Sequence, residues 1–502
     1  EDDPATRLDT LDKLMVAAGL DPDEAGPFIA PLLGVDPGTR YPSPGIAPSA
    51  MSDRAFELLA DMLLFRWRDK PHLVLLEDAH WIDPTTTELL HHLFARAEGM
   101  RVLFLVTFRP DYEGLRRDTP VNKTLIELTR LPRTQGLELI KRVCGGRKLP
   151  EKLIDHIIDR TDGVPLYVEE MTKSILDSVD LVERDGRLEL SAPLTSLAIP
   201  STLKDSLMSR LDKLSPVKQI AQVSPVAEAG TAELDFSLKQ LVDAELLYVS
   251  GGNEDPIYTF KHALIRDAAY ESMLNSRRAE LHRRAAEALV ASFAEQTETQ
   301  PQVVAAHFER AGKAERAAEY WLKSGRKAMA ASAMTEALSH LERGLAMLDR
   351  VADENRRKVL GFGLHSAMGL AQISLKGWHA MEVEQHLQPA FELGEQVGQN
   401  QDLLMVIYGL WIHWLNRADF ERSAAWIEQA ERRAVAGDNE GWPLVIHTMK
   451  LVQERWCGSH AGVHEQAEKV LSLYDPAAHS HFVHMFGNDP KVLAYGFRSW
   501  SQ

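Results

Sequence analysis

The chain has 502 residues, of which 45% are hydrophobic and 26% are charged, a composition typical of a folded protein with several domains. Its 56 basic and 73 acidic residues give a formal net charge of −17, which argues against broad electrostatic attraction to nucleic acid or to an anionic membrane. Two distant cysteines, Cys144 and Cys457, fit a reducing, cytoplasmic interior better than a disulfide framework. No apolar run approaches the length of about 18 residues that a membrane span needs.

Two acidic residues follow an apolar run early in the chain. After a helix-and-loop region over residues 1–50, residues 55–67 predict an apolar-faced helix, and 73–76 predict a strand buried on both faces of a parallel sheet. Glu77 and Asp78 come directly after this strand, at the sheet edge where such folds bind ligands. One acid can hold Mg²⁺ through water while the other polarises the attacking water of a phosphoryl transfer. The alternative is a structural strand that runs into an exposed acidic turn.

A helix and a second strand follow the acids. Asp83 and Pro84 are typical of the cap and the first position of a helix. Residues 102–106 predict another buried strand, which delivers Thr107 and Arg109 to the same edge as the two acids. An arginine at this edge can sense a γ-phosphate, although a lone arginine after a strand is more often an ordinary surface residue.

The phosphate-binding part of a nucleotide site is not found in these residues. No Gly-x-x-x-x-Gly-Lys-[Ser/Thr] motif occurs in the chain. Because the chain opens on Glu1 rather than on methionine, the simplest interpretation is a fragment whose phosphate-binding loop lies upstream. The alternative is a degenerate ATPase. Residues 125–131 are a candidate third strand.

Helical periodicity dominates from residue 134 onward. Apolar residues at spacings of three and four over 137–143 and 153–158 predict a small helical lid beside the sheet. Gly163 can end one helix and Pro165 can start the next, which predicts a helix–helix corner. In a nucleotide-binding context the same corner would lie against an adenine ring.

Residues 198–275 have the pattern of a winged helix. Amphipathic helices are expected over 203–214 and 236–245, and a hairpin is expected from strands at 247–250 and 257–260. The candidate recognition helix is acidic rather than basic, so contact with DNA is not expected. His262 opens the helix after the hairpin, where a histidine is usually a capping or packing residue.

The remaining residues are predicted to form stacked helix pairs. Small residues recur on similar helical stretches at Gly344, Ala390, Ala430 and Val470, where they allow close helix packing. Such a solenoid binds a protein or a small effector on its concave face, or it is a packed spacer without a ligand. The indole side chains of Trp411, Trp414 and Trp426 are candidate anchors for a partner. A buried seam is favoured over that interpretation, because the first two share a helix face.

Five segments carry a resemblance to a known family: Leu75–Pro84, Val106–Pro110, Asp162–Glu170, Ile199–Asp212 and Tyr258–Tyr270. They resemble the STAND class of signalling ATPases, and more closely the ATPase and repeat region that follows the catalytic domain in bacterial class III adenylate/guanylate cyclases. Large LuxR-type regulators and some multidomain kinases carry similar segments. The set is therefore more specific for the STAND-like region than for the cyclase.

The resemblance implies a role for each matching residue. Glu77 and Asp78 would serve Mg²⁺ and water activation, Arg109 with Thr107 beside it would contact the nucleotide, and Pro165 would touch the adenine. His262 would contact a phosphate of a bound nucleoside diphosphate. The implied cofactors are ATP or ADP with Mg²⁺. A phosphate-loop strand would lie between the strand at 102–106 and the one at 125–131, so the sheet is expected to be one strand short.

The whole chain is thus expected to be mainly α with an α/β part. Residues 1–132 would be part of a P-loop NTPase sheet domain, 133–197 a helical lid, 198–278 a winged helix, and 279–502 a TPR-like α-helical solenoid. The expected function is an ATP/ADP-dependent switch in a cytoplasmic bacterial signalling protein, with a cyclase as the output domain upstream. The alternatives are a pseudo-ATPase scaffold that binds protein through its repeats, and part of a LuxR-type transcriptional activator.

Overall fold

A computed structural model describes the chain apart from residues 1–3, 34, 36–39, 42–47, 116–122, 177–180, 185–186, 191–201, 203, 206–207, 209–230, 251–255, 262, 399, 437–440, 480–488 and 501–502. The chain divides into two compact units. One combines Glu1–Lys123 with Ser292–Gln502, and the other is Thr124–Ala291. In the described residues, helices dominate and the strands pair into three two-stranded sheets.

The first unit opens with helices and a small parallel sheet. Its elements here are α1 (Pro4–Ala17), α2 (Pro22–Leu32), α3 (Pro48–Arg66), β1 (His72–Leu76), η1 (Ala79–Trp81), α4 (Pro84–Arg96) and β2 (Val102–Val106). β1 and β2 pair in parallel, with His72 opposite Val102 and Leu76 opposite Val106. One face of the sheet packs against α3 and α4 through Val74, Phe104, Leu64 and Leu93. The two predicted strands and the helix that begins after Asp83 are confirmed.

The other face of this sheet differs from the expectation. Leu73, Leu75, Leu103 and Leu105 are 63%, 54%, 65% and 49% exposed. Successive side chains of a strand point to opposite faces, and α3 and α4 cover only one face. The prediction that the first strand is buried on both faces is therefore wrong for the structure described.

The predicted third strand is also wrong for the structure described. Residues 123–132 contain no strand, and Leu125, Ile126 and Leu128 are largely exposed. A strand needs a neighbour that takes up its backbone hydrogen bonds. Here the N–H of Leu131 donates instead to the carbonyl oxygen of Gly163, in the corner between two helices.

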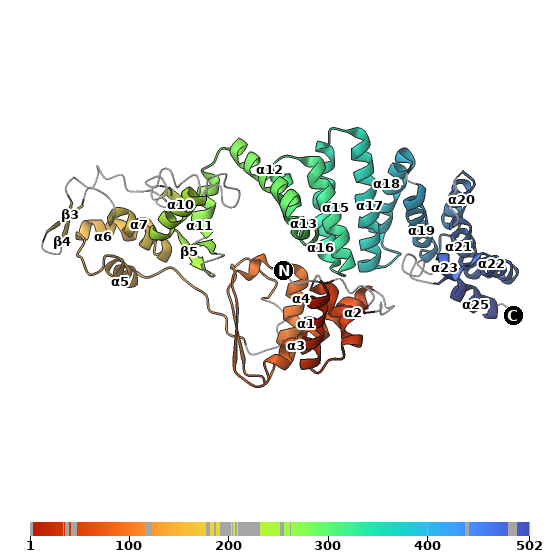
Figure 1. Cartoon of the computed structure of the whole chain (residues 1–502), viewed down its shortest axis with the longest axis horizontal. Coiled ribbons are helices and arrows are strands. Elements are labelled where there is room, and N and C mark those ends of the chain that lie inside the picture. The colour runs from red at the N-terminus through yellow and green to blue at the C-terminus, as the bar shows by residue number, and fades with distance from the viewer. Residues whose placement is uncertain are drawn as a thin grey trace. The chain divides into compact units, whose positions relative to one another are not determined.

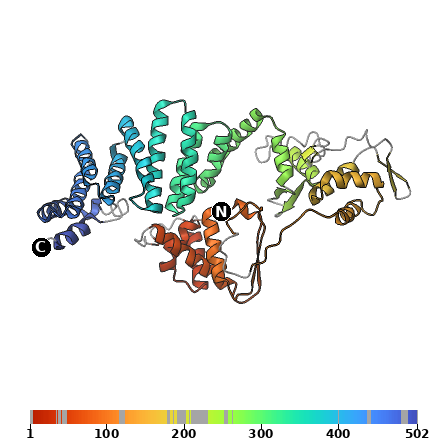
Figure 2. The same ribbon diagram turned by 180° about the vertical axis from the view of Figure 1, so that it is seen from behind.

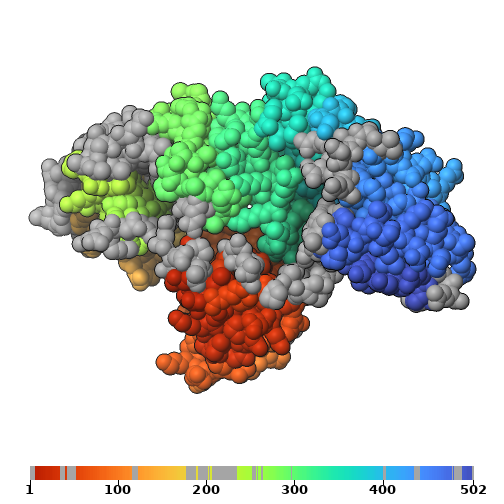
Figure 3. Space-filling view, turned by 45° about the vertical axis from the view of Figure 1, so that its right-hand side comes forward, coloured from red at the N-terminus to blue at the C-terminus, as the bar shows by residue number. Residues whose placement is uncertain are grey.

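The first unit continues as a stack of paired antiparallel helices, the solenoid, which Figures 1 and 2 show in chain order from green to blue. Its elements are α13 (Ala294–Thr299), α14 (Pro301–Arg310), α15 (Ala314–Ala330), α16 (Met334–Met347), η3 (Leu348–Arg350), α17 (Glu354–Lys376), α18 (Met381–Val397), α19 (Asn400–Asn416), α20 (Phe420–Ala436), α21 (Trp442–Trp456), α22 (His460–Leu473), α23 (Pro476–His479) and α25 (Pro490–Trp500). The space-filling view shows these helices following one another along the colour order (Figure 3).

The recurring small residues lie where neighbouring helices approach closely. Ala390, Ala430 and Val470 have no exposed surface. A Cβ added to Gly344 would lie 2.6 Å from Leu364 on the next helix. The expectation that small residues mark helix crossings in this region is confirmed.

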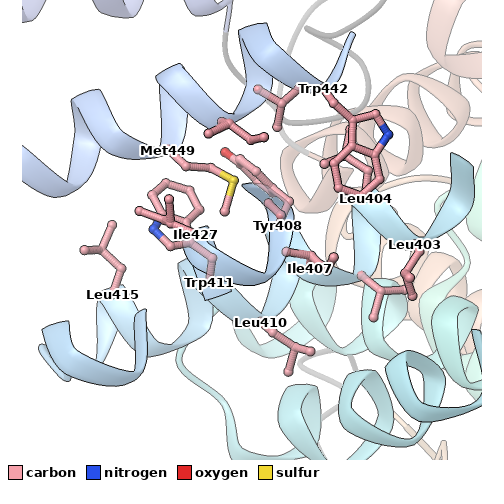
Figure 4. Packing of buried hydrophobic residues seen from close by; sticks show 14 of the residues in the cluster. Leu403, Leu404, Ile407, Tyr408, Leu410, Trp411, Leu415, Ile427, Trp442 and Met449 are labelled. Carbon is pink, nitrogen blue, oxygen red and sulfur yellow. The ribbon is translucent and has the colours of Figure 1, made fainter. Parts of the chain in front are cut away.

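The largest buried cluster lies in the C-terminal half of the solenoid, and Figure 4 shows its centre. Trp411 is 0% exposed and Trp414 is 8% exposed, while Trp426 packs partly buried against the cluster. The indole Nε1–H of Trp411 donates to the Gln453 side-chain oxygen at 3.3 Å. The Ser423 hydroxyl donates to the same oxygen at 2.7 Å. For Trp411 and Trp414, the buried-seam interpretation is confirmed over that of exposed anchors for a partner.

Five histidines along the solenoid have lowered pKa values, and burial is the first cause for each: His307, His340, His365, His386 and His413. His365 on α17 and His386 on α18 face each other, with their Nδ1 atoms 3.2 Å apart. Burial, together with the positive charge that His386 can carry, lowers the pKa of His365 to about 4. These imidazoles are therefore neutral in the folded protein at neutral pH.

We expect the solenoid to lose stability on acidification. The unfolded chain takes up protons near pH 6.5, whereas folded His365 does so only near pH 4, so stability is complete above pH 6.5 and falls as the pH decreases through this window. The loss from His365 alone should be about 2 kcal/mol at about pH 5. Urea unfolding monitored by circular dichroism at several pH values measures this change. The variant His365→Gln should flatten the profile, and a profile changed equally by His460→Gln, at an exposed histidine, would contradict the assignment.

The second unit contains a three-helix group and two hairpins. Its elements are α5 (Arg133–Val143), α6 (Glu151–Thr161), α7 (Pro165–Leu176), β3 (Leu181–Arg184), β4 (Arg187–Leu190), α10 (Thr231–Asp243), β5 (Leu247–Ser250), β6 (Ile257–Phe260), α11 (Ala263–Glu271) and α12 (Asn275–Ser292). The pairing of β5 with β6 confirms the predicted hairpin. Most of the helix predicted over 203–214 lies outside the described residues, so the winged helix stays a prediction.

Candidate functional site

Four of the predicted site residues meet at the carboxyl end of the β1–β2 sheet. Glu77 and Asp78 follow β1, and Thr107 and Arg109 follow β2. The Asp78 N–H donates to the Thr107 hydroxyl oxygen at 2.9 Å. The N–H of Thr107 donates to the carbonyl oxygen of Leu76, the last residue of β1, at 2.9 Å. Thr107 thus ties the two loops of this edge together, and we call Glu77, Asp78, Thr107 and Arg109 the acid edge.

Asp78 has an unusual backbone conformation. Its φ of 54° and ψ of 43° place it in the left-handed region, which non-glycine residues enter uncommonly and aspartate more readily than most. The side chain makes no capping hydrogen bond to the short helix η1 that follows, and the residue is exposed. The bend therefore presents the carboxylate to solvent instead of using it to close η1.

Arg109 lies on the same side of the sheet as Trp81. Its guanidinium carbon is 5.8 Å from the centre of the indole ring, at the outer limit of a cation–π contact. Trp81 is 73% exposed, which is unusual for the largest apolar side chain. The pair gives the acid edge a flat, exposed aromatic surface with a cation beside it.

His80 was not predicted as part of the site. Both of its ring nitrogens are buried, and neither has a hydrogen-bond partner in the described structure. Its ring lies 5.2 Å from that of Trp81. Buried polar atoms are nearly always paired in folded proteins, so the two ring nitrogens of His80 are an unusual feature beside the acid edge. The only signal in the sequence was its position two residues after Asp78.

The two other predicted site residues are not part of the acid edge as the structure describes it. Pro165 is exposed at the first position of α7 in the second unit. The corner before it is confirmed, because Asp162 and Gly163 have φ values of 48° and 69° and end α6. A Cβ on Gly163 would also collide with the backbone of Leu131, which explains glycine at this corner. His262 lies outside the described residues.

The donor atoms of the acid edge suit a hard cation only in part. Carboxylate oxygens are the protein ligands that Mg²⁺ prefers, and Mg²⁺ commonly keeps several waters and completes its shell with substrate phosphates. Glu77 and Asp78 fit that arrangement. No group of three or more histidine, cysteine, aspartate or glutamate side chains that could hold a metal ion occurs in the described ranges. Nor does any helix there have the length and apolar character needed to cross a membrane.

Comparisons with known proteins include one relative in sequence and one solved structure. An uncharacterized protein of Rhizobium meliloti (strain 1021) is 27% identical over 473 residues, which cover 89% of this chain and 45% of that protein. The chain thus spans less than half the length of this relative. The solved structure is that of a Signal Transduction ATPase with Numerous Domains (STAND) protein with a tetratricopeptide repeat sensor, from Pyrococcus horikoshii. The match covers 89% of this chain and 74% of the Pyrococcus chain. Its TM-score is 0.32 and its identity is 13%, too low to support a conclusion. No protein-family model matches the chain.

Proposed function

We propose that this chain is the regulatory region of an ATP/ADP-dependent signalling switch of the STAND type, in which the acid edge contributes the Mg²⁺ and water-activating carboxylates. The observation that carries the proposal is the convergence of Glu77, Asp78, Thr107 and Arg109 at the carboxyl end of a parallel strand pair. Open α/β sheets bind ligands at this end. The acids would hold Mg²⁺ through water and polarise the attacking water, and Arg109 would stabilise phosphate charge.

Two features support a sheet that is completed outside residues 1–502. The phosphate-binding motif is not in this sequence, and the leucine face of β1 and β2 is exposed. Parallel sheets are normally covered on both faces, and a row of four exposed leucines is apolar surface of the kind that another element covers. The proposal therefore includes a phosphate-binding loop and strand supplied by further residues of the complete gene product.

The solenoid would be the sensor of this switch and would bind a protein or a small effector. Stacked helix pairs present an extended surface in which each pair packs mainly against the next pair, an architecture suited to binding partners. The output domain would be a nucleotide cyclase, as in the cyclases that the sequence resembles. A pseudo-ATPase scaffold shares the same solenoid and differs only in lacking turnover.

Photolabelling of the complete gene product with 8-azido-ATP tests the nucleotide site. The azido group reacts close to the adenine, so label is expected in the peptide that contains Pro165, and excess ADP should block it. If nucleotide binds only through the acid edge, label should instead appear near Trp81. Label that excess ADP does not block, or that appears in neither peptide, would contradict the proposed site.

A further inference from the structure

The first turn of α4 has one backbone donor that its own cap does not satisfy. Pro84 has no N–H. The N–H of Thr86 donates to the Asp83 side chain at 2.6 Å, and the N–H of Thr87 donates to the Asp83 carbonyl oxygen at 3.0 Å. This leaves the N–H of Thr85 without a partner in α4 or its cap, as is usual for the first turn of a helix.

Glu336 of the solenoid supplies the missing acceptor. Its Oε1 accepts the N–H of Thr85 at 2.7 Å, across 251 positions of sequence. Glu336 lies in the first turn of α16, and Figure 1 shows α4 beside that end of α16. A carboxylate at a helix N-terminus accepts a charge-assisted hydrogen bond and also meets the positive end of the helix dipole. The solenoid therefore completes the cap of the helix that follows the acid edge.

The same contact is opposed by crowded negative charge. Burial raises the pKa of Glu88, one turn further along α4, and the charges of Glu336 and of Asp53 on α3 raise it further, while neighbouring histidines on α4 partly offset this. The second oxygen of Glu336, Oε2, is buried without a hydrogen-bond partner. For Asp83, burial acts to raise the pKa, but the hydrogen bonds from the Thr86 hydroxyl and backbone N–H outweigh it and lower the value. Attraction and repulsion are thus combined at one small contact.

We infer that Glu336 is a releasable link through which the solenoid holds the first turn of α4. A ligand or partner that displaces α16 would break the hydrogen bond to the Thr85 N–H. The first turn of α4, whose cap residue Asp83 lies five residues after Asp78, would then lose this contact with the solenoid. The link itself follows from the contacts described above. Its consequence, that occupancy of the repeats reaches the acid edge through α4, rests on the proposed function.

Hydrogen–deuterium exchange of the 502-residue chain, resolved to single amides by fragmentation, tests the link without nucleotide. In Glu336→Ala the Thr85 amide should exchange about tenfold faster or more, as expected for loss of a hydrogen bond to a charged group. Glu336→Gln keeps an acceptor oxygen and should retain most of the protection. Glu88→Gln removes repulsion and should slow exchange below that of the unmodified chain. Thr335→Ala, at an exposed neighbour on α16, is the matched control.

Unchanged exchange at Thr85 in Glu336→Ala would overturn the link, and so would equal acceleration in Thr335→Ala. Thermal unfolding of each variant separates loss of the link from loss of the fold, because Glu336→Gln and Thr335→Ala should melt as the unmodified chain does. If the exchange result holds and the complete gene product fails to bind nucleotide, the link stands and the proposed function fails.

Discussion

Asp78→Asn in the complete gene product should leave ATP binding nearly unchanged and lower hydrolysis by about 10²- to 10⁴-fold, the range expected for loss of a general base or water-positioning group. The substitution is conservative for the backbone, because asparagine adopts the left-handed conformation of this residue as readily as aspartate. The hydrogen bond from its backbone N–H to Thr107 should persist. Only the carboxylate charge is removed.

Equilibrium binding of a fluorescent ATP analogue and steady-state phosphate release measure the two effects of Asp78→Asn separately. Asp111→Asn, at an exposed aspartate in the loop after β2, is the control and should change neither. Equal loss of binding and turnover would assign Asp78 to binding rather than to catalysis. No loss of either would show that Asp78 belongs to an exposed structural turn and has no role in binding or hydrolysis.

Trp411→Ala should lower the free energy of unfolding of the solenoid by about 3–5 kcal/mol, the usual cost of removing a fully buried tryptophan. Trp411 has no exposed surface, and its ring packs 5.1 Å from that of Tyr408. The substitution would also remove one donor to the Gln453 oxygen, which the Ser423 hydroxyl would still satisfy. The cost should therefore come mainly from the cavity and the lost apolar contacts.

Urea unfolding monitored by circular dichroism checks this value, with Trp456→Ala as the matched control. Trp456 is 63% exposed near the end of α21, so its removal should cost less than about 0.5 kcal/mol. Similar losses for the two variants would contradict the assignment of Trp411 to the centre of the core.

The sequence predicted the features that depend on neighbouring residues. Apolar runs that end in polar residues predicted β1 and β2. The Asp83-Pro84 pair predicted the start of α4, because helix capping involves only the next three residues. The β5–β6 hairpin was located by two short alternating runs around a turn. At the acid edge, parallel pairing brought together residues that lie about 30 positions apart in the chain.

Features that depend on distant residues were not predicted. The exposure of Leu73 and Leu105 depends on how many elements cover a sheet, which an apolar run does not reveal. The contact between Thr85 and Glu336 joins helices 251 positions apart and has no periodicity to indicate it. His80 was overlooked because a single histidine after two acids has no distinctive spacing, and only its unpaired buried nitrogens draw attention to it.

Titration with ATP and Mg²⁺ of the 502-residue chain and of the complete gene product tests the central claim most directly. The claim is that the acid edge is one half of a nucleotide site whose phosphate-binding half lies outside these residues. Carboxylates repel polyphosphate unless Mg²⁺ and backbone N–H donors are also present, so the 502-residue chain should bind ATP weakly or not at all. The complete gene product should bind it at micromolar concentration or below. Micromolar binding by residues 1–502 alone, or no binding by the complete gene product, would contradict the account.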